Sequence, residues 1–163
     1  MIVLGIDPGT ANTGYGVVVS RGSTLAALDG GVIETRAGAP LERRLADIHA
    51  RVCDLIGEHR PVALAIEDLY FGRNAHSAFA VGQARGVVLL APARAGLPVF
   101  EYAANLVKKS VTGAGHADKR QIAMMVGRLL PGVEATADAA DALAVAICHA
   151  HHRATAKRVE AAF

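Results

Sequence analysis

The chain has 163 residues, of which 52% are hydrophobic and 20% charged, and its formal net charge is only +2. This balance excludes a disordered protein, and two cysteines without a Cys-x-x-Cys pair exclude a disulfide scaffold or a zinc ribbon. No apolar run reaches the roughly 18–20 residues of a membrane-spanning helix, and the first residues lack the pattern of a signal peptide. We therefore expect one soluble, cytoplasmic domain over residues 1–163, with no role in a membrane.

The hydrophobic pattern predicts an α/β fold with the order β-β-β-α-β-α-β-α-α-α. Short apolar or β-branched runs that end in turns predict strands at residues 2–7, 14–20, 24–35, 62–67 and 98–102. Helical spacing, stop signals and capping residues predict helices at residues 40–60, 75–95, 103–110, 118–130 and 137–152. We expect a mixed sheet whose first three strands form an antiparallel meander, a bulge at Gly30–Gly31, and a frayed tail after about residue 153.

Four carboxylates stand at the ends of predicted elements. Asp7 ends the first strand and Glu67 the fourth, while Asp138 and Asp141 share one face of the last helix. If the first and fourth strands are neighbours, all four acids meet at the sheet edge where α/β proteins place ligands. Carboxylate oxygens suit Mg²⁺ or Mn²⁺, and two such ions can support phosphodiester cleavage. The pattern predicts a metal-dependent site.

Each acid also has a structural explanation. Asp7 precedes Pro-Gly and could form an Asx turn, Glu67 could mark a solvated strand exit, and Asp138 suits the positive end of a helix dipole. Asp141 is harder to explain in this way, because its alanine and leucine neighbours predict a buried helix, where an unpaired acid is costly. The joint pattern carries the interpretation.

Glycines cluster around the end of the first strand. Gly9, Gly14 and Gly16 lie in or beside the turn that follows Asp7. They either let a backbone or ligand approach closely or serve an ordinary hairpin.

Positive charge is concentrated in the middle of the chain. Residues 85–128 hold seven Lys and Arg against two acids, a net charge of +5, whereas the flanking parts are net acidic. Such a block indicates a phosphate-binding surface or a solvated helix face.

The predicted helix over residues 75–95 is rich in small residues, which favours either an interface between two copies or close packing on the sheet.

Near the end of the chain, Cys148, His149, His151 and His152 look like metal ligands. Neighbouring positions on a helix point in different directions, so we expect no zinc site there.

Taken together, several segments resemble the RuvC family of Holliday junction resolvases. They are Ile2 to Thr10, Thr13 to Val17, Ala65 to Glu67, Gly82 to Gly86, Pro98 to Ala103 and Ala137 to Ala144. The resemblance spans nearly the whole chain and implies an RNase H-like fold and a homodimer that binds four-way junction DNA. Symmetric nicks on two opposing strands, with 5′-phosphate and 3′-hydroxyl ends, are the activity it implies in recombination and repair.

The resemblance also implies roles for particular residues. Asp7, Glu67, Asp138 and Asp141 would be the catalytic metal ligands for two Mg²⁺ ions, which Mn²⁺ can replace. The residues expected to contact DNA are Lys108, Lys119, Tyr70, Phe71, Arg73 and Arg120. Tyr70 occupies a position where the family often has Phe, so either Tyr70 or Phe71 is the ring expected to stack on bases. The RuvA–RuvB branch-migration complex is the implied partner.

Three other functions remain open at this point. An actin-like or sugar-kinase-like ATPase shares the Asp-Gly-Thr type of loop but needs two such domains, and the chain has no G-x-x-x-x-G-K-[ST] motif. Another RNase H-like nuclease, acting on an RNA–DNA hybrid or as a different small resolvase, would use the same acids. A non-catalytic protein that binds nucleic-acid junctions would hold the four acids only as relics, and the presence of all four argues against it.

Overall fold

One five-stranded sheet organises the part of the chain that the computed structural model describes, residues 1–68, 75–132 and 136–160. The strand order is β3-β2-β1-β4-β5, so the sheet is mixed, as predicted, and the first and fourth strands are neighbours. The antiparallel meander of β1, β2 and β3 is confirmed, and β4 and β5 run parallel to β1. The strands are β1 (Ile2–Asp7), β2 (Asn12–Arg21), β3 (Thr24–Glu34), β4 (Ala63–Glu67) and β5 (Val99–Tyr102).

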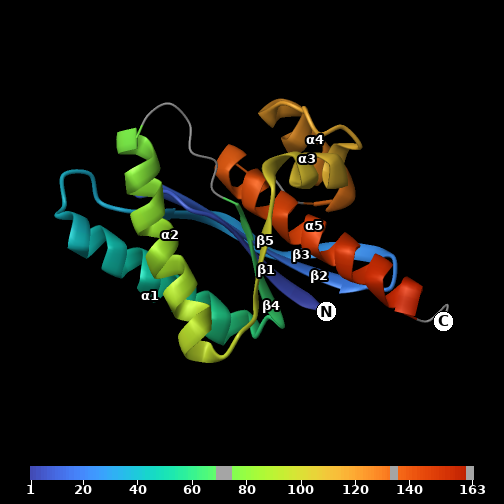
Figure 1. Ribbon diagram of the computed structural model, residues 1–163, viewed down its shortest axis with the longest axis horizontal. Coiled ribbons are helices and arrows are strands. Elements are labelled where there is room, and N and C mark those ends of the chain that lie inside the picture. Colours follow the sequence, from blue (N-terminus) through green and yellow to red (C-terminus); the bar gives the residue numbers. More distant parts are fainter. Residues whose placement is uncertain (69–74, 133–135, 161–163) are drawn as a thin grey trace.

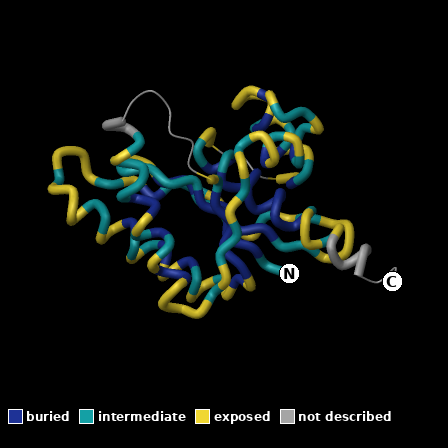
Figure 2. Tube along the Cα trace, in the orientation of Figure 1, coloured by how far each residue is buried: buried dark blue, intermediate teal, exposed yellow. Residues whose placement is uncertain are grey.

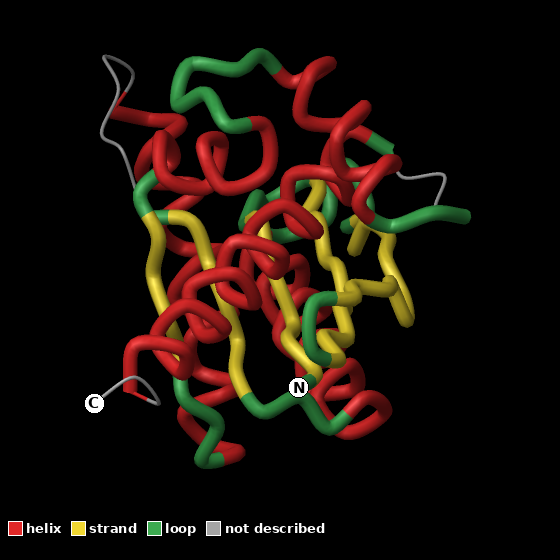
Figure 3. The backbone as a smooth tube through the Cα atoms, turned by 90° about the vertical axis from the view of Figure 1, so that its right-hand side faces the viewer, coloured by secondary structure: helices red, strands yellow, loops and turns green. Residues whose placement is uncertain are grey.

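Helices cover both faces of this sheet (Figure 1). On one face lie α1 (Leu41–His59) and α2 (Ala75–Ala95). On the other lies α5 (Ala137–Glu160), with α3 (Ala104–Thr112) and α4 (Lys119–Leu129) packed beside it. Figure 3, turned by 90°, shows the strands side by side with helices in front and behind. Among the described helices, none is long and apolar enough to cross a membrane.

Each face of the sheet contributes to its own core. Along β1, Val3 packs toward α5, whereas Leu4 and Ile6 pack toward α1 and α2. The central strands β1 and β4 are therefore buried on both sides, as the dark-blue centre of Figure 2 shows. This explains why both strands are nearly continuous apolar runs that end in an acid.

Helix α5 lies directly on the backbone of β1 and β2. A Cβ atom at Gly5 would overlap the carbonyl oxygen of Ala142, and one at Gly14 would overlap that of Asp138. The glycines near Asp7 therefore admit the close approach of a helix, which was one of the two explanations that the sequence left open.

Two predicted details are wrong. The β3 bulge falls at Leu28, because Val17 pairs with Asp29 and Val18 with Ala27. Gly31 pairs regularly opposite Tyr15, whose ring occupies the space that a Cβ atom there would need. The last helix also does not stop near residue 152 but extends to Glu160. Its final turns contain alanine, arginine, lysine and glutamate, all good helix formers, so the helix continues into the polar part of the chain.

Candidate active site at the carboxyl ends of β1 and β4

The two strand acids are neighbours because their strands are neighbours. In the parallel β1–β4 pair, Ile6 is in register with Ile66, so Asp7 and Glu67 follow at the same sheet edge. The first turns of α5 carry Asp138 and Asp141 to this edge, since Gly14 lets the helix lie against β2 there. The structure thus brings together all four acids predicted from the sequence.

Burial and crowding of negative charge raise the pKa values of two of these carboxyl groups. Burial, with the charges of Asp141 and Glu67, raises the pKa of Asp7 from 3.8 to about 7, and Asp138 adds to the effect. Burial and Asp141 also raise the pKa of Glu67. A divalent cation would relieve this repulsion, and four carboxylates are the hard-oxygen donor set that Mg²⁺ and Mn²⁺ take. The residues present therefore fit a metal site.

The four acids do not form a closed set of ligands. Among the described residues, one set of three has ligand atoms that all lie within 4.8 Å of one another, and it consists of Asp29, Glu58 and His59. No three of the four acids meet this distance in the described structure. The members of that other cluster already have partners. Nε2 of His59 lies 3.1 Å from Oδ2 of Asp29, and Glu58 pairs with Arg51, which lies outside the cluster. The four acids remain the candidate site, and ion binding would have to draw their oxygens inward.

Two lysines flank the acids. Nζ of Lys119 donates to Oδ2 of Asp141 at 2.9 Å, and its side chain is 71% exposed. The charges of Lys119 and Lys108 both lower the pKa of Glu67, which places Lys108 of α3 at the same edge. Both lysines are thus near the acids and partly accessible, which is where a phosphate backbone would approach.

A helix cap fixes the position of Lys119. Oδ1 of Asp118 accepts a hydrogen bond from the Gln121 amide at 2.8 Å, and the Gln121 side chain accepts one from the Asp118 amide at 2.9 Å. This capping box starts α4 at Lys119, the residue whose side chain pairs with Asp141 of α5. Arg120, the next residue, is exposed. Tyr70, Phe71 and Arg73 lie outside the described residues.

Thr13 closes the turn after Asp7. Its buried hydroxyl donates to the Gly9 carbonyl at 2.7 Å and accepts from the Gly9 amide at 3.2 Å. The Thr35 hydroxyl and the Arg44 guanidinium also donate to the Thr10 carbonyl, each at 2.7 Å. Among the described residues, the Asp7 side chain accepts none of the hydrogen bonds of this turn, so Asp7 does not act as the Asx-turn residue that the sequence also allowed.

The cysteine and histidines of α5 do not all converge, although Sγ of Cys148 lies 3.6 Å from Nδ1 of His152. His149 is buried, and its Nδ1 lies 2.8 Å from the Tyr102 hydroxyl. His151 faces Ser110, and Nδ1 of His152 lies 2.8 Å from the Cys148 carbonyl oxygen of its own helix. They do not form a metal-ligand group within the described residues.

Arg85 has a place that the sequence did not predict. It was counted only as part of the basic block, but its side chain is buried and contacts the ends of β4 and β5. The signal that could have indicated this is local, because Arg85 is the one charged residue between Phe79 and Ala93 in α2.

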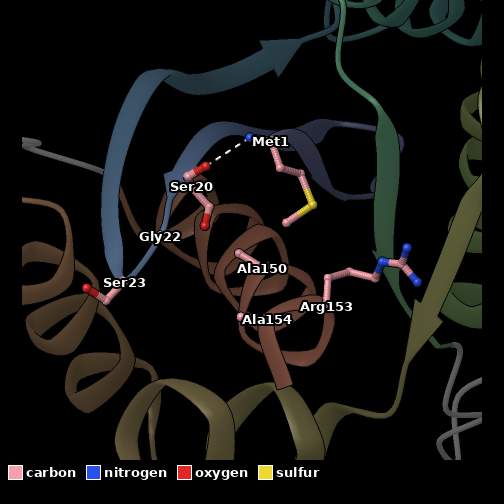
Figure 4. Close-up of a pocket in the computed structure, with 7 residues that line it drawn as sticks. All are labelled: Met1, Ser20, Gly22, Ser23, Ala150, Arg153 and Ala154. Carbon is pink, nitrogen blue, oxygen red and sulfur yellow. Dashed lines mark hydrogen bonds between the residues drawn. The ribbon is translucent and has the colours of Figure 1, made fainter. Parts of the chain in front are cut away.

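A separate hollow lies at the opposite end of β1. It has a volume of about 520 Å³ and is lined by residues including Met1, Ser20, Ala150 and Arg153 (Figure 4). The Met1 ammonium donates to the Ser20 carbonyl at 2.9 Å, shown as a dashed line there. This hollow and the acids are therefore distinct places.

Known proteins resemble the chain over almost its full length. The family model described as crossover junction endodeoxyribonuclease RuvC matches residues 3–149. The protein of that name from Maricaulis maris is 58% identical over 151 residues, covering 93% of this chain and 91% of its own length. The structure of T. thermophilus RuvC in complex with a Holliday junction substrate matches with a TM-score of 0.89 at 40% identity, covering 96% of both chains. The yeast mitochondrial Holliday junction resolvase Ydc2 has a TM-score of 0.69 at 16% identity, covers 96% of this chain and 80% of its own, and shows a shared fold alone.

Proposed function

The chain belongs to the RuvC family of crossover junction endodeoxyribonucleases, and we propose that it resolves four-way DNA junctions as one RNase H-like nuclease domain. The observation that carries this proposal is the meeting of four acids and two lysines at one sheet edge. The acids match a metal-dependent hydrolase, and the lysines match a phosphate backbone as substrate.

We assign the metal site to Asp7, Glu67, Asp138 and Asp141. Bound Mg²⁺, or Mn²⁺ in its place, would supply an activated water and a stabilised leaving oxygen, and two ions are the number that this chemistry commonly uses. The chain's part is to hold the oxygens in place and to keep the site partly dry. Without an ion, a pKa of about 7 leaves about half of the Asp7 carboxyls protonated near pH 7, so ion binding releases that fraction of protons.

DNA contact is assigned to the lysines and their neighbours. Lys119 and Lys108 would bind phosphates on either side of the cleaved bond, and Arg120 would extend this surface along α4. In the DNA-bound state, Lys119 would exchange its pairing with Asp141 for phosphate. Tyr70, Phe71 and Arg73 stay predictions of the family resemblance, as does cooperation with the RuvA–RuvB complex.

We infer a homodimer from the symmetry of the junction, and the exposed outer face of α2 offers a surface for the contact between two copies. Two equivalent strands of a junction require two sites related by a two-fold axis. The outer face of α2 presents Phe79 and Leu90, 69% and 47% exposed, and a Cβ atom at Gly82 or Gly86 would meet nothing within 4 Å. Positions 79, 82, 86 and 90 share one helical face, so an apolar strip with room for a second backbone lies open there.

A cleavage assay tests the proposal. The purified chain is incubated with a labelled four-way junction, a linear duplex and an RNA–DNA hybrid, each with Mg²⁺, Mn²⁺ or EDTA. We expect paired nicks on opposing junction strands in either metal and none in EDTA. Cleavage of the hybrid alone would move the chain to another RNase H-like nuclease function, and binding without cleavage would leave a junction-binding protein.

A further inference from the structure

Arg85 is a buried cation of α2 that reaches the ends of two strands. Its side chain is only 8% exposed, and its helix neighbours Ala84 and Val88 lie in the apolar core. Nη1 donates to the backbone carbonyl oxygen of Glu67, and Nη2 lies 2.6 Å from Oε2 of Glu101. One side chain of α2 thus contacts both the end of β4 and β5.

These two contacts explain how the charge is tolerated. A buried guanidinium is costly unless its donors are used and its charge is balanced. Glu101, half exposed, supplies the balancing charge from the surface side. The guanidinium is a rigid planar fork, so the bond to the Glu67 carbonyl oxygen has a fixed direction relative to the ion pair. The arginine therefore holds the strand ends at a set distance from α2.

The contact is with the main chain of Glu67 and not with its carboxylate. The cations that lower the pKa of that carboxyl are Lys108 and Lys119, which belong to α3 and α4 on the opposite face of the sheet. Arg85 therefore does not supply the counter-charge that a metal ion or a lysine supplies. It fixes the peptide group from which the carboxylate extends.

We propose that Arg85 is a positioning residue that fixes the main chain at Glu67 and so sets where this carboxylate can meet metal ions. This inference rests on the proposed function, because it takes Glu67 as a metal ligand. The same strand ends are joined by the Asp68 amide, which donates to the Tyr102 carbonyl at 2.8 Å. Loss of the arginine contact should loosen that bond as well. Outer contacts of this kind are worth about 10–100-fold in metal affinity or activity.

The first measurements need no DNA and no catalysis. In Arg85→Met, we expect the Asp68 amide to exchange with deuterium at least about tenfold faster, since the strand ends open more often. The Leu64 amide, which donates to Pro98 at the other end of the same strand pair, should exchange at its wild-type rate. Binding of Mn²⁺, followed by electron paramagnetic resonance, should weaken about tenfold.

The second measurement separates positioning from general damage. Arg85→Met should raise the Mg²⁺ concentration for half-maximal junction cleavage about tenfold, while the Kd for the junction in EDTA stays within twofold of wild type. Excess Mg²⁺ should restore part of the rate. A variant that loses junction affinity and cleavage in equal measure, without a shift in Mg²⁺ dependence, would overturn the proposal.

Three further variants serve as controls. Arg94→Met removes the same charge from an exposed position in the last turn of α2 and should change nothing. Arg85→Lys should be intermediate, and so should Glu101→Gln, because the neutral amide oxygen can still accept from Nη2 but no longer balances the buried charge. If Arg85→Met does not fold, an Arg85→Lys protein with wild-type exchange and metal dependence overturns the proposal. A wild-type chain that cuts no junction would instead refute the proposed function, whatever the variants do.

Discussion

The carboxyl of Asp7 combines two properties that have one cause. It lies among three other acids at a partly dry sheet edge, so its pKa rises to about 7, and the same surroundings make it suited to hold a divalent cation. Lys119 already moderates the repulsion, but as a single charge paired with Asp141 on a largely exposed side chain. Substitutions at Asp7 and at Lys119 can therefore test metal coordination and positive charge separately.

Asp7→Asn tests coordination. The change removes one carboxylate oxygen donor and one negative charge, so we expect cleavage to fall by about 10³-fold or more while junction binding is kept or slightly tightened. Strand cleavage in Mg²⁺ and a gel-shift titration in EDTA measure the two effects. Cleavage at the wild-type rate would remove Asp7 from the active site.

The raised pKa of Asp7 also predicts a pH-dependent stability. Between about pH 4 and pH 7 the folded chain keeps a proton that the unfolded chain has lost, so stability in EDTA falls as pH rises through this window. Asp7→Asn lacks this penalty. We expect its Tm to equal that of wild type near pH 4. At pH 8 its free energy of unfolding should be larger than that of wild type by roughly 2 kcal/mol, which raises Tm by about 4–8 °C. Scanning calorimetry at both pH values measures this, and a Tm difference that is the same at both pH values would contradict it.

Lys119→Ala tests phosphate contact. Loss of one phosphate-neutralising charge should weaken junction binding and reduce the slope of log K against log salt by about one. Arg21→Ala is the matched control, because Arg21 is exposed at the opposite end of β2 from the acids. Equal slopes for Lys119→Ala and wild type would mean that Lys119 does not touch phosphate.

At the scale of elements, order and type could be predicted because the local signals were strong. Strands β1 and β4 are continuous apolar runs closed by acids, and α1 has clear helical spacing. The bulge at Leu28 could not be predicted, since it depends on which element packs opposite. The burial of Arg85 had one local signal, a single charge in an otherwise uncharged stretch of α2, but its partners depend on the packing of α2 against β4 and β5. The acids converged as expected because the β1–β4 pairing and α5 bring them together, but their spacing depends on side-chain packing that no sequence pattern shows.

The contact between α5 and β2 predicts an effect of Gly14→Ala. The new Cβ would overlap the Asp138 carbonyl oxygen, so the helix must shift where it carries a site acid. We expect a loss of about 1–3 kcal/mol in stability and a loss of cleavage at temperatures where the variant is still folded. Gly57→Ala is the control, since its Cβ in α1 meets nothing within 4 Å and should stabilise by about 0.5–1 kcal/mol. Urea unfolding and cleavage at low temperature measure both, and full activity in folded Gly14→Ala would contradict this role of the helix.

At the scale of the whole molecule, symmetry decides the outcome of cleavage. The described part of a single chain brings together one such group of four acids, so two nicks in one binding event need two chains held together. The outer face of α2 is the surface that we assign to this contact, because Phe79 and Leu90 are exposed there beside glycines with open space. The basic lysines of α3 and α4 lie on the opposite face of the sheet from α2, so dimer contact and phosphate contact do not compete for the same surface.

Phe79→Asp tests this assignment. A charge on the apolar strip should weaken self-association by tenfold or more, since the aspartate loses its hydration in the contact. Sedimentation would then show monomers at concentrations where wild type is dimeric, and a supercoiled cruciform plasmid would be nicked once and not linearised by paired cuts. Val62→Asp, at a 55% exposed apolar position just before β4 and at the end of the sheet away from the acids, is the control for charge alone. If Phe79→Asp stays dimeric and cuts in pairs, the two-fold contact lies elsewhere than on α2.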